Sequence, residues 1–442
     1  MRGAWRGWLY ALLCVVIAVC LAALSARFGF TADWSAGARA TLTPQSRSLL
    51  NQLNGPLRVT SYARPGALRA KTRLLVERYR RFKRDITLKF VDPDLDPVAT
   101  QDANITANGE LVLTWHGRTQ HVTDLDEPDF SDALVRLARG GNKLVAFITG
   151  NGERDATGTS AADLGNFVKR LSARGVRALP LNLANAAEVP RNANLVVLAN
   201  PQAALLPTSV QKLEDYVANG GNLLWLSEPG SDDLGLAPLA EALGIKRLPG
   251  MLLDTGSTTG SGDPRLLVTT HYPSSTITNG FDVNTVFPQA AVLAALSGAE
   301  WNTQPILQSG AHSWNQTAPV DPAQVAFDPD SGELKGPLTF GYALSRLSPS
   351  PDKNQQRVVV IGDGDFLSNA YLSDAGNQAF GERVFDWLLG DDALASVPPA
   401  APDIALKPTR AELGILTFGY LIALPVILIL IGLAISWRRR RR

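Results

Sequence analysis

The stretch Lys143 to Thr149, with the sequence KLVAFIT, runs directly into Gly150-Asn151-Gly152-Glu153 and decides the fold. A short, nearly continuous apolar run that stops at a glycine turn is typical of a strand buried on both faces of a sheet. The segments that follow alternate between helical and extended patterns: a helix at about 161–173, strands at 176–181 and 194–199, a helix at 207–219 and a strand at 222–227. This alternation predicts a parallel, doubly wound α/β sheet.

The α/β pattern is interrupted and then returns. From about residue 230 to 356 the chain is rich in Gly, Ser, Thr and Pro, with short β-like pieces at 266–270, 291–296 and 338–344. We expect a long insertion there, made mostly of β-structure and loops. A strand at 357–361, the loop Gly362-Asp363-Gly364-Asp365-Phe366 and a helix at about 378–389 then complete the domain.

A smaller α/β unit precedes this domain. A strand at 57–62, a basic helix and a strand at 86–91 form a βαβ pattern, and a hairpin at 110–115 and 120–123 extends it. The order of elements is similar to a thioredoxin-like fold. The unit contains no CxxC motif, so the redox chemistry of that fold is not available to it.

Uncharged apolar stretches at 8–26 and 413–437 lie at the two ends of the chain. Each is long enough for a transmembrane helix, which needs roughly 20 apolar residues. Arginines flank both stretches on the side of the nearer terminus, which predicts that both termini are cytoplasmic and that the main domains are extracytoplasmic, at a bacterial inner (plasma) membrane. A cleaved signal peptide is the alternative for the first stretch, and a lipoprotein signal ending at Cys20 is a weaker one.

The predicted fold class is therefore α/β, with terminal transmembrane helices bracketing a thioredoxin-like domain and a doubly wound domain. The expected organisation is an N-terminal anchor at 1–30, a connector at 31–55, the thioredoxin-like domain at 56–128, the doubly wound domain at 129–395, a proline-rich stalk at 396–410, a transmembrane helix at 411–437 and an arginine tail at 438–442.

Composition excludes several kinds of chemistry. The only cysteines, Cys14 and Cys20, lie in the first apolar stretch, so the rest of the chain has no disulfide, thiolate nucleophile or Cys metal site. Without Arg2, Arg6 and the five terminal arginines, 35 of the 42 basic residues remain against 41 acidic residues, which gives no electrostatic support for nucleic-acid binding. HExxH, GxSxG and P-loop motifs are all absent, and we expect neither a metal nor a cofactor.

The helix within 58–84 carries a basic outer face. Its candidate contact residues are Arg69, Arg73, Arg80 and Arg84. Such a face contacts anionic lipid headgroups or an acidic partner, or it is simply solvated.

The candidate ligand-binding residues follow the ends of the predicted parallel strands, where doubly wound folds bind their ligands. They are Asn151, Glu153, Glu228, Asp363, Asp365 and Asn369. Carboxylates that converge there would bind a cation or sugar hydroxyls. The alternative is structural, since Gly, Asp and Asn are also common in turns and helix caps.

Several motifs, taken in order, resemble one family. They are Leu42-Thr43-Pro44-Gln45, Val91-Asp92-Pro93-Asp94, Thr149-Gly150-Asn151-Gly152-Glu153, Ala218-Asn219-Gly220-Gly221-Asn222-Leu223-Leu224, Ser309-Gly310-Ala311-His312-Ser313-Trp314 and Val360-Ile361-Gly362-Asp363-Gly364-Asp365-Phe366-Leu367-Ser368-Asn369. Their order resembles that of the auxiliary components of gliding-motility-type ABC transport systems. The resemblance implies a non-catalytic membrane subunit beside an ABC permease and an ABC ATPase, with a degenerate domain similar to class I glutamine amidotransferases.

Two functions follow as expectations. The first is an auxiliary subunit whose exported domain acts as a scaffold or sensor for the permease, the substrate or an envelope component. The alternative is an exported carbohydrate-binding or hydrolytic protein that uses the acidic strand-end loops on a glycan or ester. The missing cysteine nucleophile favours a protein that is not an enzyme.

Overall fold

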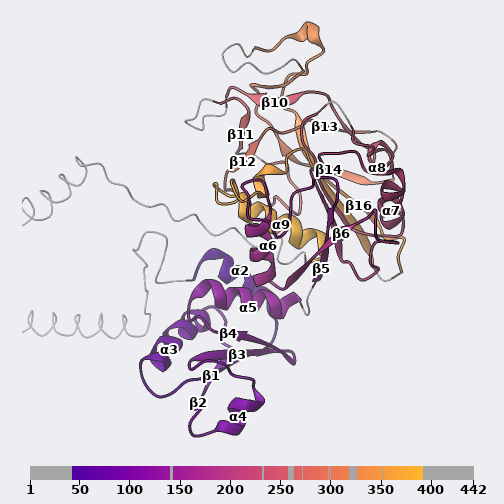
Figure 1. The fold of residues 1–442 in the computed structure, drawn as a ribbon. Coiled ribbons are helices and arrows are strands. Elements are labelled where there is room, and N and C mark those ends of the chain that lie inside the picture. The colour runs from indigo at the N-terminus through magenta and orange to yellow at the C-terminus, as the bar shows by residue number, and fades with distance from the viewer. Residues whose placement is uncertain are drawn as a thin grey trace, which may run out of the picture. The chain divides into compact units, whose positions relative to one another are not determined.

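The computed structural model describes residues 42–139, 143–230, 233–256, 263–270, 272–296, 298, 300–317, 326–351 and 353–391 (Figure 1). All of them lie within one compact unit of the chain, residues 1–401. They contain a four-stranded sheet, a seven-stranded sheet and three two-stranded ladders.

The four-stranded sheet has the order β2-β1-β3-β4. Its strands are β1 (Leu57–Tyr62), β2 (Ile86–Val91), β3 (Glu110–Trp115) and β4 (Arg118–Val122). β1 and β2 are parallel and are joined by helix α3 (Ala67–Arg80), whereas β3 is antiparallel to both β1 and β4. The βαβ unit and the hairpin predicted from the sequence are both present.

The hairpin between β3 and β4 closes with only two residues, His116 and Gly117. Both have positive φ angles, 48° and 77°. Two-residue turns of this kind match the twist of the flanking strands. For this reason β4 begins at Arg118 and not at the predicted Gln120.

Three helices cover one face of the four-stranded sheet. Helices α2 (Pro44–Gln52), α3 and α5 (Glu127–Arg139) share a hydrophobic core with the alternate apolar residues of β1 and β3. The opposite face is covered only in part, by α4 (Pro97–Asp102), a helix that the sequence analysis did not predict.

The seven-stranded sheet has the order β14-β16-β17-β8-β7-β5-β6. Its strands are β5 (Lys143–Thr149), β6 (Val176–Asn182), β7 (Leu195–Ala199), β8 (Leu223–Leu226), β14 (Asn302–Gln308), β16 (Thr339–Leu347) and β17 (Gln355–Ile361). The five strands from β17 to β6 are parallel to one another. These five are the strands that the sequence predicts to be parallel, whereas β14 and β16 come from the predicted insertion, and β16 is antiparallel to both β17 and β14.

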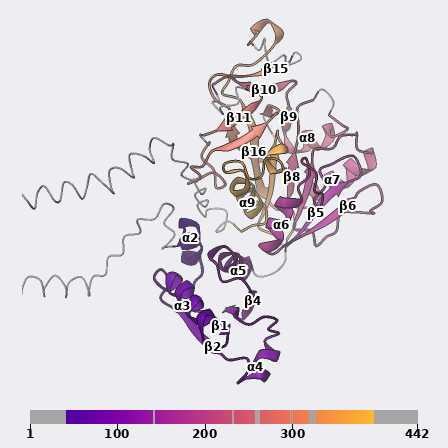
Figure 2. The same cartoon turned by 60° about the vertical axis from the view of Figure 1, so that its left-hand side comes forward.

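Helices lie on both faces of this sheet, which makes it doubly wound. Helices α6 (Gly165–Ala173) and α9 (Asn377–Leu388) share a core with one face, and α7 (Pro207–Ala218) and α8 (Ala237–Leu243) share a core with the other. Figure 2 shows these four helices around the sheet. Helix α6 begins later than predicted because Asp163 binds the backbone N–H and the hydroxyl of Ser160 and holds the preceding residues in a loop.

The predicted insertion is divided between two structures. Its second half supplies β14 and β16 to the main sheet. Its other strands form three antiparallel ladders, β9 (Ile245–Arg247) with β13 (Leu293–Ala295), β10 (Met251–Asp254) with β15 (Ser313–Gln316), and β11 (Leu266–Thr269) with β12 (Thr285–Pro288). Two short 3-10 helices, η1 (Pro329–Ser331) and η2 (Asp365–Leu367), complete the described elements.

A cluster of charged side chains joins α5 to α6 and α9. We call it the helix charge cluster, and its members are Asp132, Arg139, Arg170, Arg174, Glu382, Asp386 and Asp391. Arg139, the last residue of α5, forms ion pairs with Asp386 and with Asp391. Arg174, just after α6, binds Glu382 and Asp386 of α9. The cluster therefore links the helix that follows the first sheet to two helices of the second.

The structure does not support the predicted transmembrane helices. Among the residues that the structure describes, no helix is long and apolar enough to cross a membrane. The longest of these helices, α3, has 14 residues, whereas a crossing needs roughly 20. The stretches 8–26 and 413–437 lie outside the described residues, as do 31–41, the stalk at 396–410 and the tail at 438–442. The fold class supported by the structure is a mixed α/β protein.

Candidate functional site

The candidate site lies at the carboxyl ends of the parallel strands. Residues 150–154 follow β5, Glu228 comes shortly after β8, and residues 362–365 follow β17. The last two segments are in contact, because the Gly364 N–H donates to Oε1 of Glu228 at 2.9 Å.

Arg154 joins the three segments. Its Nη2 atom lies 2.9 Å from Oε1 of Glu228 and 2.8 Å from Oδ1 of Asp365, and its Nη1 atom donates to the Ala162 carbonyl at 2.8 Å. Only 8% of the side chain is exposed. Burial lowers the pKa of Arg154, but Asp365 and Glu228 outweigh burial and raise the pKa above its usual value. The guanidinium is therefore charged.

Glu228 is held close to neutrality. Burial and the negative charge of Asp365 raise the pKa of Glu228 to about 7, although Arg154 and the Gly364 N–H act in the opposite direction. Close to pH 7 this carboxyl group carries only part of a negative charge.

Asp363 is fully buried, and its two carboxyl oxygens differ. Oδ1 accepts the Phe366 N–H at 3.0 Å, whereas Oδ2 has no partner among the described residues. Burial, followed by the charges of Glu228 and Asp365, raises the pKa of Asp363 well above its usual value. Burial therefore disfavours a charge on this carboxyl group, which lies beside the two carboxyl groups that Arg154 binds.

The glycine before Asp363 is required by a close backbone contact. Gly362 donates its N–H to the Phe340 carbonyl and accepts the Ala291 N–H, both at 2.7 Å. A Cβ atom at Gly362 would lie 2.0 Å from the Ala291 carbonyl oxygen. The chain passes between two backbones at this point, and that passage fixes the position of Asp363.

Backbone hydrogen bonds join the segments that follow β5 and β7, where the strand order reverses and doubly wound folds often bind a ligand. The Arg154 N–H donates to the Ala199 carbonyl at 3.0 Å, and the N–H groups of Gln202 and Ala203 donate to the Asn151 carbonyl at 2.8 and 3.0 Å. The Glu153 carboxylate accepts the backbone and side-chain N–H groups of Asn151 at 2.7 and 3.1 Å. Asn151 and Glu153 therefore stabilise their own turn.

Asn369 lies against the loop before α6. Its Oδ1 accepts the Asn166 N–H at 2.8 Å, and its Nδ2 donates to the carbonyls of Gly158 and Ser160 at 3.2 and 2.8 Å. All three contacts are to backbone groups, so its role in the structure is to hold that loop.

The structure thus brings together three of the six predicted residues, Glu228, Asp363 and Asp365. Sequence reasoning missed Arg154, the residue that binds two of them. The available signal was its position directly after Glu153, in the loop that follows the strand at 143–149. Among the described residues, no group of three or more His, Cys, Asp or Glu side chains is arranged to hold a metal ion. The chemistry of this arrangement is charge compensation by Arg154, with the pKa values of Glu228 and Asp363 both raised.

The four predicted residues of the basic helix have different surroundings. Arg69 and Arg73 lie over the Phe90 ring, with Cζ 5.3 and 5.5 Å from its centroid, and Arg69 also donates to the Ala63 carbonyl at 2.8 Å. Arg80 pairs with Glu77 at 2.6 Å. Arg84 is exposed and lies beyond the end of α3.

Fold and site define a class: a doubly wound α/β protein whose strand-end carboxyl groups are held by an internal arginine. A family model described as "ABC-type uncharacterized transport system" matches residues 142–389, more than half of the 442 residues. The chain belongs to this family and is an auxiliary component with a role in an ABC transport system. A second model, for a domain of unknown function, matches residues 36–120.

Similar solved structures add no functional argument. The mmIFT52 N-terminal domain is 17% identical, with 55% of this chain and 97% of that chain covered and a TM-score of 0.43. A ThuA-like protein from Bacteroides uniformis ATCC 8492 is 11% identical, with 56% and 91% covered and a TM-score of 0.30. Mitochondrial thioredoxin 3 from Saccharomyces cerevisiae is 14% identical, with 22% and 92% covered and a TM-score of 0.17. No curated protein matches the sequence.

Proposed function

We propose that this chain is a non-catalytic auxiliary subunit of a gliding-motility-type ABC transport system, with its large domain acting as a scaffold or sensor. The domain contacts the permease, the substrate or an envelope component. Family membership over residues 142–389 is the observation that carries the proposal. The strand-end contacts add support, because Arg154 neutralises Glu228 and Asp365 within the chain itself.

The proposal includes a main domain, residues 129–395, that is similar to class I glutamine amidotransferases and has lost their activity. Its parallel strands and flanking helices are compatible with that fold. A glutaminase of this type needs a cysteine nucleophile with a histidine base. The only cysteines of the chain, Cys14 and Cys20, precede the domain by more than one hundred residues.

The partners in this proposal are a permease and an ATPase on separate chains. The sequence has no P-loop, so ATP hydrolysis belongs to another subunit. We place the protein at the bacterial inner membrane with its main domains outside the cytoplasm. The support is its family and the absence of cysteine from residue 21 onward.

The acidic strand ends are the site that the alternative function would use. A carbohydrate-binding or hydrolytic protein needs carboxylates that face a ligand. Arg154 binds two of the three carboxyl groups, and Asp363 is 0% exposed. The described contacts therefore favour the scaffold, and a ligand site at Asp363 and Asp365 is tested by alanine at each. A transport-linked phenotype that stays unchanged at normal protein level would sink the ligand-site idea.

Contact through the basic helix is a separate part of the proposal. Arg80 and Arg84 lie at the exposed carboxyl end of α3. The test is cosedimentation of the full chain with vesicles that contain 30% phosphatidylglycerol, a composition on the order of natural anionic membranes. We expect the variant with Arg80→Glu and Arg84→Glu to bind less, and the variant Arg191→Glu, on a distant exposed loop, to bind as the wild type does.

The decisive experiment is mild detergent extraction of the tagged full-length protein from its native cells, followed by mass spectrometry. An ABC ATPase and a multispanning permease in near-equal amounts would support the auxiliary role. Recovery of the protein alone, at normal expression, would count against it. Hydrolysis of a glycan or an ester by the purified chain would instead favour the alternative.

A further inference from the structure

Strand β6 forms one edge of the seven-stranded sheet. Its only strand neighbour among the described residues is β5. The Lys143 N–H donates to the Gly175 carbonyl at 3.1 Å, and this bond determines which residues of β6 direct their backbone groups toward β5. In a parallel ladder every second residue of an edge strand bonds its neighbour, so Arg177 and Leu179 face β5. The backbone N–H and C=O groups of Val176 and Ala178 point outward.

Pro180 limits this free edge. Proline has no N–H to offer an added strand and is typical of exposed edges. The pairing surface is therefore short, running from Val176 to the Pro180 carbonyl. Within the described part of the chain, no residue forms a hydrogen bond to the outward groups of Val176 or Ala178.

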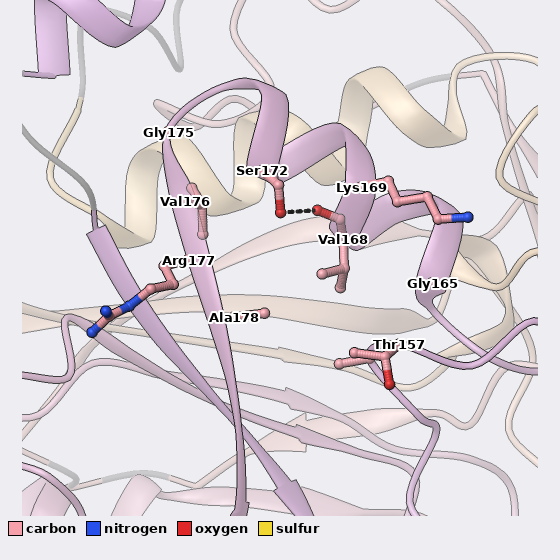
Figure 3. A pocket seen from close by; sticks show the side chains of 10 residues that line it. Thr157, Gly165, Val168, Lys169, Ser172, Gly175, Val176, Arg177 and Ala178 are labelled. Atoms are coloured by element: carbon pink, nitrogen blue, oxygen red, sulfur yellow. Dashed lines mark hydrogen bonds between the residues drawn. The ribbon is translucent and has the colours of Figure 1, made fainter.

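A groove of about 550 Å³ runs along the same edge, between β6 and α6. Its lining includes Gly165, Val168, Lys169, Ser172, Val176 and Ala178. Figure 3 shows Val168 and Ser172 of α6 opposite Val176 and Ala178 of β6. The side chains nearest the free edge are small, so another backbone can approach it closely.

Two of the polar side chains in the groove donate to groups within the chain, and two charged side chains are exposed to solvent. The Ser172 hydroxyl donates to the Val168 carbonyl at 2.9 Å, and the Thr157 hydroxyl donates to Asp155 at 2.9 Å. Lys169 and Arg177 are exposed, and neither forms an ion pair with a described residue. Figure 3 shows their side chains extending to opposite sides of the groove. Backbone edge groups and two cations therefore remain available to a partner.

We propose that the β6 edge and the adjoining groove bind an extended, acidic segment of a partner protein, which adds as a strand beside β6. Main-chain hydrogen bonds to Val176 and Ala178 supply the affinity in this recognition mode, and side-chain contacts supply the specificity. Side chains of an added strand alternate between the two faces of the sheet. Acidic residues on one face meet Lys169, and those on the other meet Arg177.

A second copy of this chain is a poorer occupant. Two β6 edges paired with each other would bring one Arg177 side chain close to the other, and like charges on neighbouring strands are destabilising. An acidic segment avoids that repulsion. The inference stands independently of the ABC role, because it concerns the chemistry of the segment and not the identity of its owner.

The test uses the purified full-length protein and a fluorescent heptapeptide, Glu-Glu-Val-Val-Glu-Glu-Val, which places Glu side chains on both faces of an added strand. We expect saturable binding that weakens as salt concentration rises. The variant with Lys169→Glu and Arg177→Glu should bind at least tenfold more weakly. Arg191→Glu changes an exposed arginine elsewhere and should leave binding unchanged. A Lys-Val heptapeptide of the same length should not bind.

Amide hydrogen exchange locates the peptide. Binding should protect the amides of Val176 and Ala178, whereas the Arg177 amide, already bonded to β5, should change little. No saturable binding of the acidic peptide, equal affinity of the doubly reversed variant, or protection elsewhere with none at residues 176–178 would each overturn the proposal. Self-association of the free protein that protects the same two amides would overturn it in favour of a second copy.

Discussion

Arg139 and Asp386 lie 247 residues apart in the sequence and form an ion pair in which both side chains are at most 3% exposed. Arg139 ends α5, and Asp386 lies in the last turn of α9. The Arg139 guanidinium also donates to the Arg174 carbonyl at 2.8 Å and pairs with Asp391 at 3.0 Å. One side chain therefore satisfies three acceptors from distant parts of the chain.

Replacing Arg139 should destabilise the protein strongly. Arg139→Met keeps much of the aliphatic volume but removes a cation from two carboxylates, and breaking a buried ion pair from one side costs about 3 to 5 kcal/mol. Urea unfolding measures the change in the free energy of unfolding. The control is Arg191→Met, since the Arg191–Glu188 pair is 90% and 67% exposed and such pairs contribute less than about 1 kcal/mol. Equal losses in the two variants would contradict the structure.

Two glycines in the loop after β17 should differ sharply in their response to alanine. At Gly362 the new Cβ would lie 2.0 Å from a backbone oxygen, whereas at Gly364 its nearest neighbour, Nε of Arg154, would lie 3.2 Å away. We expect Gly362→Ala to cost about 2 kcal/mol or more and Gly364→Ala less than about 1 kcal/mol. Thermal and urea unfolding of both variants provide the check. The idea fails if Gly364→Ala is the more damaging change.

Glu228 should make stability fall as pH rises. The folded protein keeps the Glu228 proton up to about pH 7, while the unfolded chain releases it near pH 4.5. Between these values the folded state binds more protons, so stability decreases with increasing pH, by an amount on the order of 2 to 3 kcal/mol. Glu228→Gln should flatten this decline, and the raised pKa of Asp363 accounts for the slope that remains. Unfolding free energies at pH 5 and pH 8 measure it, and an unchanged slope would refute the assignment.

Glu110 should affect the pH dependence of stability in the opposite direction from Glu228, so that stability falls as pH decreases. Burial, the largest influence, raises the pKa of Glu110, but hydrogen bonds from His121, Thr106 and Ala107 outweigh burial and lower the pKa below 4.5. Its contribution to stability is therefore present above pH 4.5 and is lost as pH falls through the lowered value. Glu110→Gln should cost about 1 to 3 kcal/mol at pH 7 and less at pH 3.5.

The control for Glu110 is Asp94→Asn. Asp94 pairs with Arg64, but the two side chains are 60% and 59% exposed. Solvent screens such a pair, so this variant should change stability little at either pH. A Glu110→Gln variant as stable as Asp94→Asn at pH 7 would remove the basis for the prediction.

Strands with a clear continuous or alternating apolar pattern were the part of the fold that could be predicted best from the sequence. Segments 143–149 and 57–62 appear as β5 and β1 with the predicted bounds, because their apolar patterns persist whatever surrounds them. The segment 338–344 was predicted as β-structure, but β14 and β16 were not placed in the main sheet. β16 joins that sheet by pairing with β17, whose predicted strand lies beyond the insertion, and β14 pairs with β16. Pairing between strands that are distant in sequence produces no periodic residue pattern, so it cannot be predicted from local sequence.

For a related reason, only part of the candidate site could be predicted from the sequence. Strand-end position was enough to group Glu228, Asp363 and Asp365. The same rule also selected Asn151, which donates to the Glu153 carboxylate of its own turn, and Asn369, whose side chain binds backbone groups. Arg154 was missed because strand-end reasoning looked for acidic and amide groups, and the partner of two carboxylates is a cation one residue further along.

The contact between Arg139 and Asp391 has a topological consequence. The chain enters the domain of the seven-stranded sheet and leaves it at neighbouring points. Arg139 precedes the first strand, β5, by four residues, and Asp391 follows the last helix, α9, by three. A short linker could therefore join residue 391 to residue 139, and the chain could be opened at an exposed surface loop instead. Circular permutation should thus leave the sheet intact, and a foreign host protein could carry residues 139–391, with the Arg139 ion pairs retained, as an inserted cassette.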